Sequence, residues 1–148
     1  MTWRWFGVLV VATAFSAAAA SQMPPTIRRL DTPAGTYLVT ADGRALYTYE
    51  PDEQANGASA CNDKCLALWS PMLADADAVS SEPWSFATRA DGTRQWRYKG
   101  RPLYRFVKDD TPHARYGDGK NRLWHVALDP LPMPPGIGVR RTLKGDID

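Results

Sequence analysis

The two cysteines are the residues whose type and spacing are best suited to chemistry. Cys61 and Cys65 are separated by three residues, and two soft thiolates joined by a distant imidazole would suit copper binding. His113 and His125 are the imidazoles that such a site would use. The same pair could instead exchange thiols, remain free, or form a disulfide, which this spacing can reach from a turn.

Two copies of an aromatic and acidic motif form a second candidate site. They consist of Tyr47, Tyr49 and Asp52, and of Tyr104, Phe106 and Asp109. The rings could stack on a sugar or an aromatic ligand while the carboxylates make polar contacts. Alternatively, the rings are core residues of a sheet and the carboxylates accept N–H groups from the following turns. Duplication favours the core interpretation, because both halves of a pseudo-symmetric core need the same packing.

Motifs for other chemistry are weak or missing. Noncovalent haem could use His113, His125 or Met72 as axial ligands, but the Cys-x-x-Cys-His motif of covalent haem is absent. The chain also lacks a Gly-x-Ser-x-Gly elbow, a Walker loop and a His-Glu-x-x-His motif. The sequence therefore favours a non-enzymatic protein and predicts no cofactor, with copper or haem as alternatives.

The first twenty residues are typical of a secretory signal. Arg4 precedes an apolar run over residues 6–15, and the alanines at 18–20 fit cleavage before Ser21. The run is too short to span a bilayer, and no cysteine for lipid attachment lies at the cleavage point. We expect a periplasmic or secreted protein with no stable membrane insertion after cleavage. In an oxidising compartment, a disulfide between the two cysteines is the first expectation.

The charge of the chain is nearly balanced, with 18 Lys and Arg against 16 Asp and Glu. This balance, without a basic stripe, argues against a nucleic acid partner, because such binding depends on many phosphate contacts. The expected partner is a small molecule or a component of the cell envelope, of unknown identity.

An internal repeat organises the chain. Residues 42–52 and 99–109 share Gly-Arg-x-Leu-Tyr-x-aromatic-x-x-Asp in register, without a gap. A strand-like run precedes each copy, at 36–40 and 95–98, and a tryptophan follows each copy. Three dipeptides between β-prone runs, Asp42-Gly43, Asp91-Gly92 and Lys99-Gly100, predict hairpins.

These elements predict a mainly β fold, a pseudo-twofold double repeat of β-hairpins with one short helix at residues 62–69. On the second strand of each hairpin, the leucine side is expected to be only partly buried. The expected divisions are a signal at 1–20, a spacer at 21–30, a β domain at 31–129 and a Pro/Gly-rich tail at 130–148. Within the domain, repeat one covers about 35–74 and repeat two about 84–129.

The paired motifs resemble the secreted-repeat family of predicted bacterial lipoproteins. Further likeness comes from Cys61-x-x-x-Cys65, from the segment 69–74 that follows it and from the segment 91–96. The resemblance covers roughly residues 35–126 and implies a bacterial protein that resides outside the cytoplasm. It implies little about activity, because the function of the family is unknown. Membrane anchoring is not implied here, since no lipidated cysteine follows the signal.

Overall fold

The computed structural model of the chain describes residues 22–130, so the predicted signal and residues 131–148 of the predicted tail lie outside the described residues. The fold is mainly β. The described elements are β1 (Ile27–Thr32), β2 (Gly35–Thr40), β3 (Leu46–Tyr49), α1 (Pro51–Gln54), the 3-10 helix η1 (Asp63–Ala67), β4 (Trp69–Pro71), β5 (Trp84–Thr88), β6 (Arg94–Tyr98), β7 (Arg101–Pro102), β8 (Tyr104–Phe106), the 3-10 helix η2 (Lys120–Arg122) and β9 (Trp124–Val126). Within this part of the chain, no helix has the length and apolar character needed to cross a membrane.

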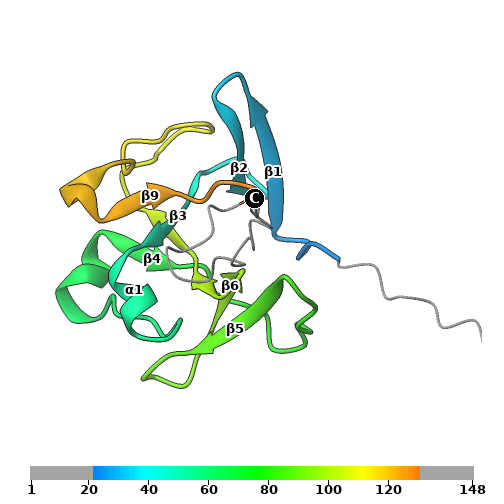
Figure 1. The fold of residues 1–148 in the computed structure, drawn as a ribbon, viewed down its shortest axis with the longest axis vertical. Coiled ribbons are helices and arrows are strands. Elements are labelled where there is room, and N and C mark those ends of the chain that lie inside the picture. Colours follow the sequence, from blue (N-terminus) through cyan, green and yellow to red (C-terminus); the bar gives the residue numbers. More distant parts are fainter. Residues whose placement is uncertain (1–21, 131–148) are drawn as a thin grey trace, which may run out of the picture.

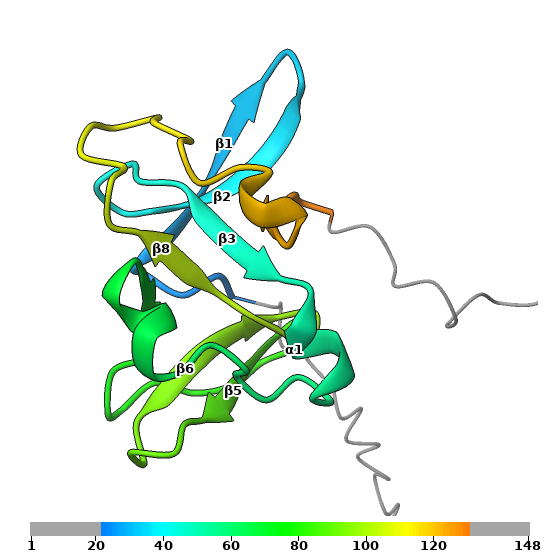
Figure 2. The ribbon, with the colours of Figure 1, turned by 90° about the vertical axis from the view of Figure 1, so that its left-hand side faces the viewer.

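The strands form three antiparallel sheets. A central sheet has the order β4-β8-β3-β9, with the β1–β2 hairpin at one end and the sheet β5-β6-β7 at the other. Figure 2 shows β3 and β8 side by side in the middle of the molecule, and Figure 1 shows β9 next to β3. The central sheet therefore connects the outer parts.

The two repeats alternate within the central sheet. Strands β4 and β3 belong to repeat one, whereas β8 and β9 belong to repeat two, so every neighbouring pair joins one repeat to the other. Tyr47 of β3 lies opposite Tyr104 of β8, and these are equivalent positions of the repeated motif. A pseudo-twofold axis therefore passes through this pair, and neither repeat forms its part of the sheet alone.

The two faces of the central sheet contribute to separate hydrophobic clusters. Tyr47 and Tyr104 belong to one hydrophobic cluster, whereas Leu46 and Leu103 belong to a second cluster with Trp84 of the three-stranded sheet. The expectation that the leucine side is only partly buried is confirmed, since Leu46 and Leu103 are 0% exposed whereas Arg105, on the same side, is exposed. The period-two pattern separates the two faces correctly, but it does not reveal that the leucines pack against the three-stranded sheet.

Two of the three predicted hairpins form with their partners as expected. Strand β5 pairs with β6 across Asp91-Gly92, and β6 pairs with β7 across Lys99-Gly100. At Asp42-Gly43 the chain also turns back, because Gly43 N–H donates to the Thr40 carbonyl at 2.9 Å. After one bridge between Val39 and Ala45, however, β3 leaves β2 and pairs with β8 and β9.

The predicted spacer and the predicted helix both need correction. Strand β1 starts at Ile27, so residues 27–30 of the expected spacer belong to the folded unit. Because β1 buries only Ile27 completely, its sequence lacks a sustained apolar pattern. The segment 62–69 forms only the 3-10 helix η1, and Trp69 already belongs to β4. The α-helix α1 lies earlier, where Pro51 occupies the first turn.

Candidate functional site

The tyrosine of each motif bonds to the carboxylate of the other copy. Tyr47 Oη donates to Asp109 Oδ2 at 2.5 Å, and Tyr104 Oη donates to Asp52 Oδ2 at 2.8 Å. Tyr47 and Asp52 come from repeat one, whereas Tyr104 and Asp109 come from repeat two. The two hydrogen bonds therefore cross the pseudo-twofold axis in opposite directions and join the repeats reciprocally.

The second oxygen of each carboxylate is used inside its own repeat. Asp52 Oδ1 accepts the Ala60 N–H at 2.7 Å, and Asp109 Oδ1 accepts the Tyr116 N–H at 2.9 Å. Each aspartate thus connects its own loop to the tyrosine of the other repeat. A charged acceptor with two donors makes stronger hydrogen bonds than a neutral one does.

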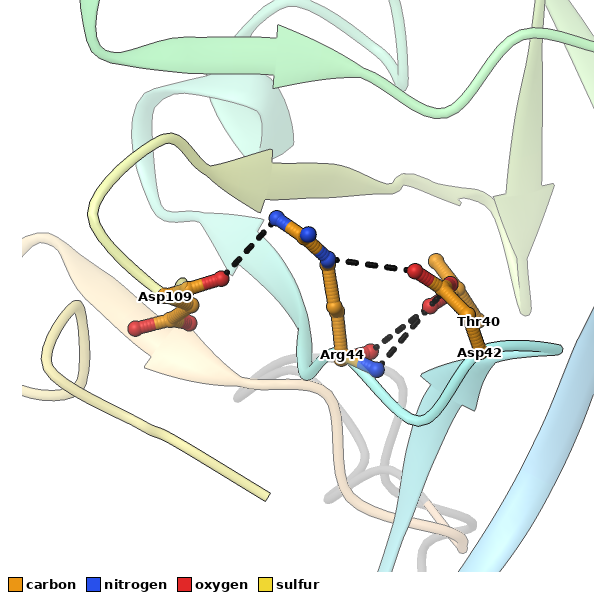
Figure 3. A network of polar contacts seen from close by, with 4 residues as sticks. All are labelled: Thr40, Asp42, Arg44 and Asp109. Atoms are coloured by element: carbon orange, nitrogen blue, oxygen red, sulfur yellow. Dashed lines mark hydrogen bonds and ion pairs between the residues drawn. The ribbon is translucent and has the colours of Figure 1, made fainter. Parts of the chain in front are cut away.

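The arginine of each Gly-Arg pair also reaches the opposite repeat. Arg44 Nη1 donates to the Asp109 carbonyl at 3.1 Å, while Asp42 and Thr40 hold the arginine from its own turn (Figure 3). In repeat two, Arg101 Nη2 lies 2.8 Å from Glu53 Oε1, next to Asp52. The shared motif therefore supplies two reciprocal sets of contacts between the repeats.

The rings of the two motifs pack around a pair of stacked tryptophans. Trp69 and Trp124, the tryptophans that follow the two copies, are parallel within 3° at a centroid distance of 3.6 Å. The edge of Tyr47 meets Trp69 at 5.2 Å, and Tyr104 meets Trp124 in the same way at 5.1 Å. Phe106 packs on Trp69 and Tyr49 on Trp124. This six-ring arrangement, the aromatic core, repeats the symmetry of the hydrogen bonds.

Burial controls the protonation of these groups. It raises the pKa of the Tyr47 and Tyr104 hydroxyls well above the usual range, and their partner carboxylates add to this effect. Burial also raises the pKa of Asp109, and it raises the pKa of Asp52 to about 6 although Ala60 and Tyr104 donate hydrogen bonds to it. The tyrosines therefore stay protonated and act as donors at neutral pH.

The motif side chains offer little surface to a ligand. Tyr47 and Tyr104 are 0% exposed, and Asp52 and Asp109 are 1% exposed. Phe106 is buried as well, and Tyr49 is partly buried. What this arrangement can do chemically is hold two segments together through satisfied donors and acceptors.

The candidate metal ligands take no part in the hydrogen bonds between the motif tyrosines and aspartates. Cys61 and Cys65 are joined in a disulfide with their Cα atoms 5.3 Å apart, and Cys61 is completely buried. His125 Nε2 lies 2.9 Å from Glu50 Oε1 on the surface. Residues 22–130 contain no group of three or more His, Cys, Asp or Glu side chains arranged to hold a metal. The copper, haem and thiol-exchange alternatives stay predictions.

Arg89 is an important residue that sequence reasoning missed. Its side chain is buried, with 7% exposure, and its terminal nitrogens donate to Ser59 Oγ at 2.6 Å, Gln95 Oε1 at 2.8 Å and the Cys61 carbonyl at 2.9 Å. Ser59 Oγ in turn lies 2.8 Å from Tyr104 Oη. Because Arg89 stands between a strand and an Asp-Gly turn, its position in the sequence resembles that of an exposed turn residue.

A pocket of about 400 Å³ opens beside Arg89. It lies between the disulfide segment of repeat one and the β5–β6 turn of repeat two. Its lining residues are Asn62, Asp63, Leu66, Arg89, Ala90 and Asp91. We call this space the Arg89 pocket. It is a site to which the two repeats both contribute and which differs from the buried motif.

The interleaved sheet and its reciprocal contacts define a class of protein, an antiparallel β module built from two copies of one unit. The chain belongs to the family of secreted repeats of unknown function, whose sequence model matches it twice, at residues 29–72 and 85–128. This match confirms the resemblance and the double repeat. Comparison with curated proteins gives no match, and neither does comparison with solved structures.

Proposed function

We propose that this chain is an exported, non-enzymatic binding module in which the doubled motif forms the scaffold and the surface between the repeats makes the contacts with partners. The observation that carries the proposal is the reciprocal pair of buried hydrogen bonds, Tyr47 to Asp109 and Tyr104 to Asp52. Groups that are buried and fully used within the protein support a structural role for the motif.

The proposed location is the periplasm or the exterior of the cell. The family is described as secreted, and residues 1–20 have the pattern of a cleaved signal. A disulfide between Cys61 and Cys65 is compatible with an oxidising compartment. The proposed partner is a small molecule or a component of the cell envelope.

Amide hydrogen exchange of Tyr47→Phe and Tyr104→Phe tests the scaffold role. Each substitution removes one buried donor and leaves a carboxylate oxygen without its partner, so we expect a loss of about 1–3 kcal/mol in the free energy of unfolding. Because the bonds join the repeats, protection should fall in β3 and β8 together for either variant. Tyr116→Phe is the control, since Tyr116 is 64% exposed.

A result confined to one repeat would contradict the proposal. If Tyr47→Phe reduced protection only in repeat one, or if both variants were as stable as Tyr116→Phe, the motif would not be the scaffold that joins the repeats.

A further inference from the structure

We infer that the Arg89 pocket binds a small zwitterion, with a carboxylate placed at Arg89 and an ammonium group placed between Asp63 and Asp91. A free α-amino acid with an apolar side chain is the ligand class that fits this description. The inference rests on the binding role proposed above and names the site and the chemistry of its ligand.

The buried cation is the first observation behind this inference. Arg89 is 7% exposed, and its hydrogen bonds go to neutral acceptors on Ser59, Asn62, Gln95 and the Cys61 backbone. In the described part of the chain no carboxylate lies within ion-pair distance of it. Asp52 and Asp91 are near enough for the charge of Arg89 to lower their pKa values, but neither accepts a hydrogen bond from it. Buried charges in proteins are usually paired directly, so a cation that lines a pocket and bonds only to neutral groups favours an anionic group on a ligand.

The N–H at Nε of Arg89 is the donor that we assign to the carboxylate of the ligand. The terminal nitrogens make the hydrogen bonds to the protein, whereas Nε makes none to another described residue. The guanidinium is also fixed in place by those bonds, so a ligand would not have to order it. Preorganised donors of this kind reduce the entropy cost of binding.

The rim of the pocket carries the opposite charge. Asp63 and Asp91 are both exposed and both line the pocket, giving it a formal charge of −1 with Arg89 included. Hydrogen bonds from Thr93 lower the pKa of Asp91, so this carboxylate is ionised at neutral pH. A simple anion would be repelled by the rim, and a simple cation would be repelled by Arg89. A zwitterion can place its carboxylate at Arg89 and its ammonium group at the two aspartates.

The size and the remaining wall of the pocket agree with an amino acid. A volume of about 400 Å³ lies within the range of small-molecule sites, roughly 300–1,000 Å³. Leu66, which is 37% exposed, gives the pocket an apolar surface for an aliphatic side chain. Asn62 adds an amide at the same opening.

Titration of the exported protein with L-leucine, followed by two-dimensional NMR of its backbone amides, tests the inference. We expect saturable shifts of the amides at residues 62–66 and 89–91. The matched probes are 4-methylpentanoate, which lacks the ammonium group, and 3-methylbutylamine, which lacks the carboxylate. Each should bind about tenfold more weakly, because each loses one charge-assisted contact.

Two substitutions with a control locate the site. Asp63→Asn should weaken leucine binding about threefold, as expected for one exposed charge pair, and Arg89→Gln should abolish it. Asp77→Asn, in the separate pocket beside Trp96, should leave it unchanged. Asp63 makes no side-chain hydrogen bond to another described residue, so its variant keeps the test valid even if Arg89→Gln does not fold.

Several results would overturn the inference. These are the absence of saturable shifts with leucine, equal binding of either matched probe, shifts centred elsewhere, or equal affinity of Asp63→Asn and the unaltered protein. Each would leave the hydrogen-exchange test of the scaffold untouched, so failure of the pocket and failure of the proposed function can be told apart.

Discussion

The two long loops of the molecule, residues 50–68 in repeat one and 107–123 in repeat two, start from equivalent strands and serve the same aspartates differently. Each supplies one backbone N–H to its own motif carboxylate, from Ala60 and from Tyr116. The next residue is Cys61 in one loop and Gly117 in the other. The loop of repeat one thus continues with a disulfide-bonded cysteine, whereas the loop of repeat two continues with a glycine, which has no side chain.

The difference shows how the aromatic core is closed on each side. A Cβ added to Gly117 would lie 2.7 Å from Trp69 Cη2 and 3.0 Å from Tyr47 Cζ, so the backbone itself packs against the rings. On the other side, the buried Cys61 side chain belongs to the same hydrophobic cluster. The contacts across the axis are symmetric, but the loops that cover them are not. Of these two loops, the one in repeat one lines the Arg89 pocket, through its disulfide segment.

The largest effect is expected from removing either stacked tryptophan. Trp69→Ala and Trp124→Ala should each lower the free energy of unfolding by about 3–5 kcal/mol, because each leaves a cavity in the aromatic core. Denaturant unfolding of the two variants measures this. Losses of similar size would show that the core is symmetric despite the different loops. A small loss for one tryptophan alone would contradict the symmetry of the aromatic core. Tyr116→Ala is the control, because Tyr116 is exposed.

The raised pKa of Asp52 should make the stability of the protein depend on pH. Burial raises the pKa of folded Asp52 from 3.8 to about 6, so the folded state holds a proton that the unfolded state has already released between these values. The contribution of Asp52 is therefore complete below pH 4 and is lost as the pH rises through 6. As the pH rises from 4 to 7, the free energy of unfolding of Asp52→Asn should therefore increase by roughly 2–3 kcal/mol relative to that of the unaltered protein.

The control for that experiment is Asp31→Asn, which changes a carboxylate outside the motif. Because this variant keeps Asp52, the loss of stability that Asp52 causes between pH 4 and 7 should remain. If Asp52→Asn kept the full pH dependence of the unaltered protein, the raised pKa of this aspartate would be contradicted.

The smallest of these effects concerns the close approach of Gly117. Gly117→Ala should cost about 1–3 kcal/mol, because the new methyl group must displace Trp69 or Tyr47 in a packed core. Ala114→Ser, in the same loop, is a conservative control. An unchanged melting temperature for Gly117→Ala would mean that the repeat-two loop does not close the core as described.

The repeat, its turns and the two faces of its strands could be predicted from local sequence signals. The in-register repeat aligns Tyr47 with Tyr104, and the Asp-Gly and Lys-Gly pairs mark turns that the structure contains. Alternation along a strand separates the tyrosine face from the leucine face, because successive side chains point to opposite sides. The family and the mainly β class could therefore be predicted and are confirmed.

The exchange between the repeats could not be predicted from the sequence. A hairpin turn at Asp42-Gly43 suggests that β3 stays with β2, but nothing in the four residues of β3 specifies β8 as its partner. For the same reason, the sequence does not reveal that each tyrosine meets the other copy's aspartate. Arg89 becomes notable only when the fold brings it to Ser59 and Gln95.

The central claim is that the motif tyrosine of one repeat is coupled to the motif aspartate of the other. A double-mutant cycle with Tyr47→Phe and Asp109→Asn measures this coupling most directly, with Tyr47→Phe and Asp52→Asn as the matched cycle within one repeat. We expect a coupling of about 1 kcal/mol or more in the first cycle and additivity within about 0.5 kcal/mol in the second. Additivity in the first cycle, or a stronger coupling in the second, would contradict the reciprocal arrangement.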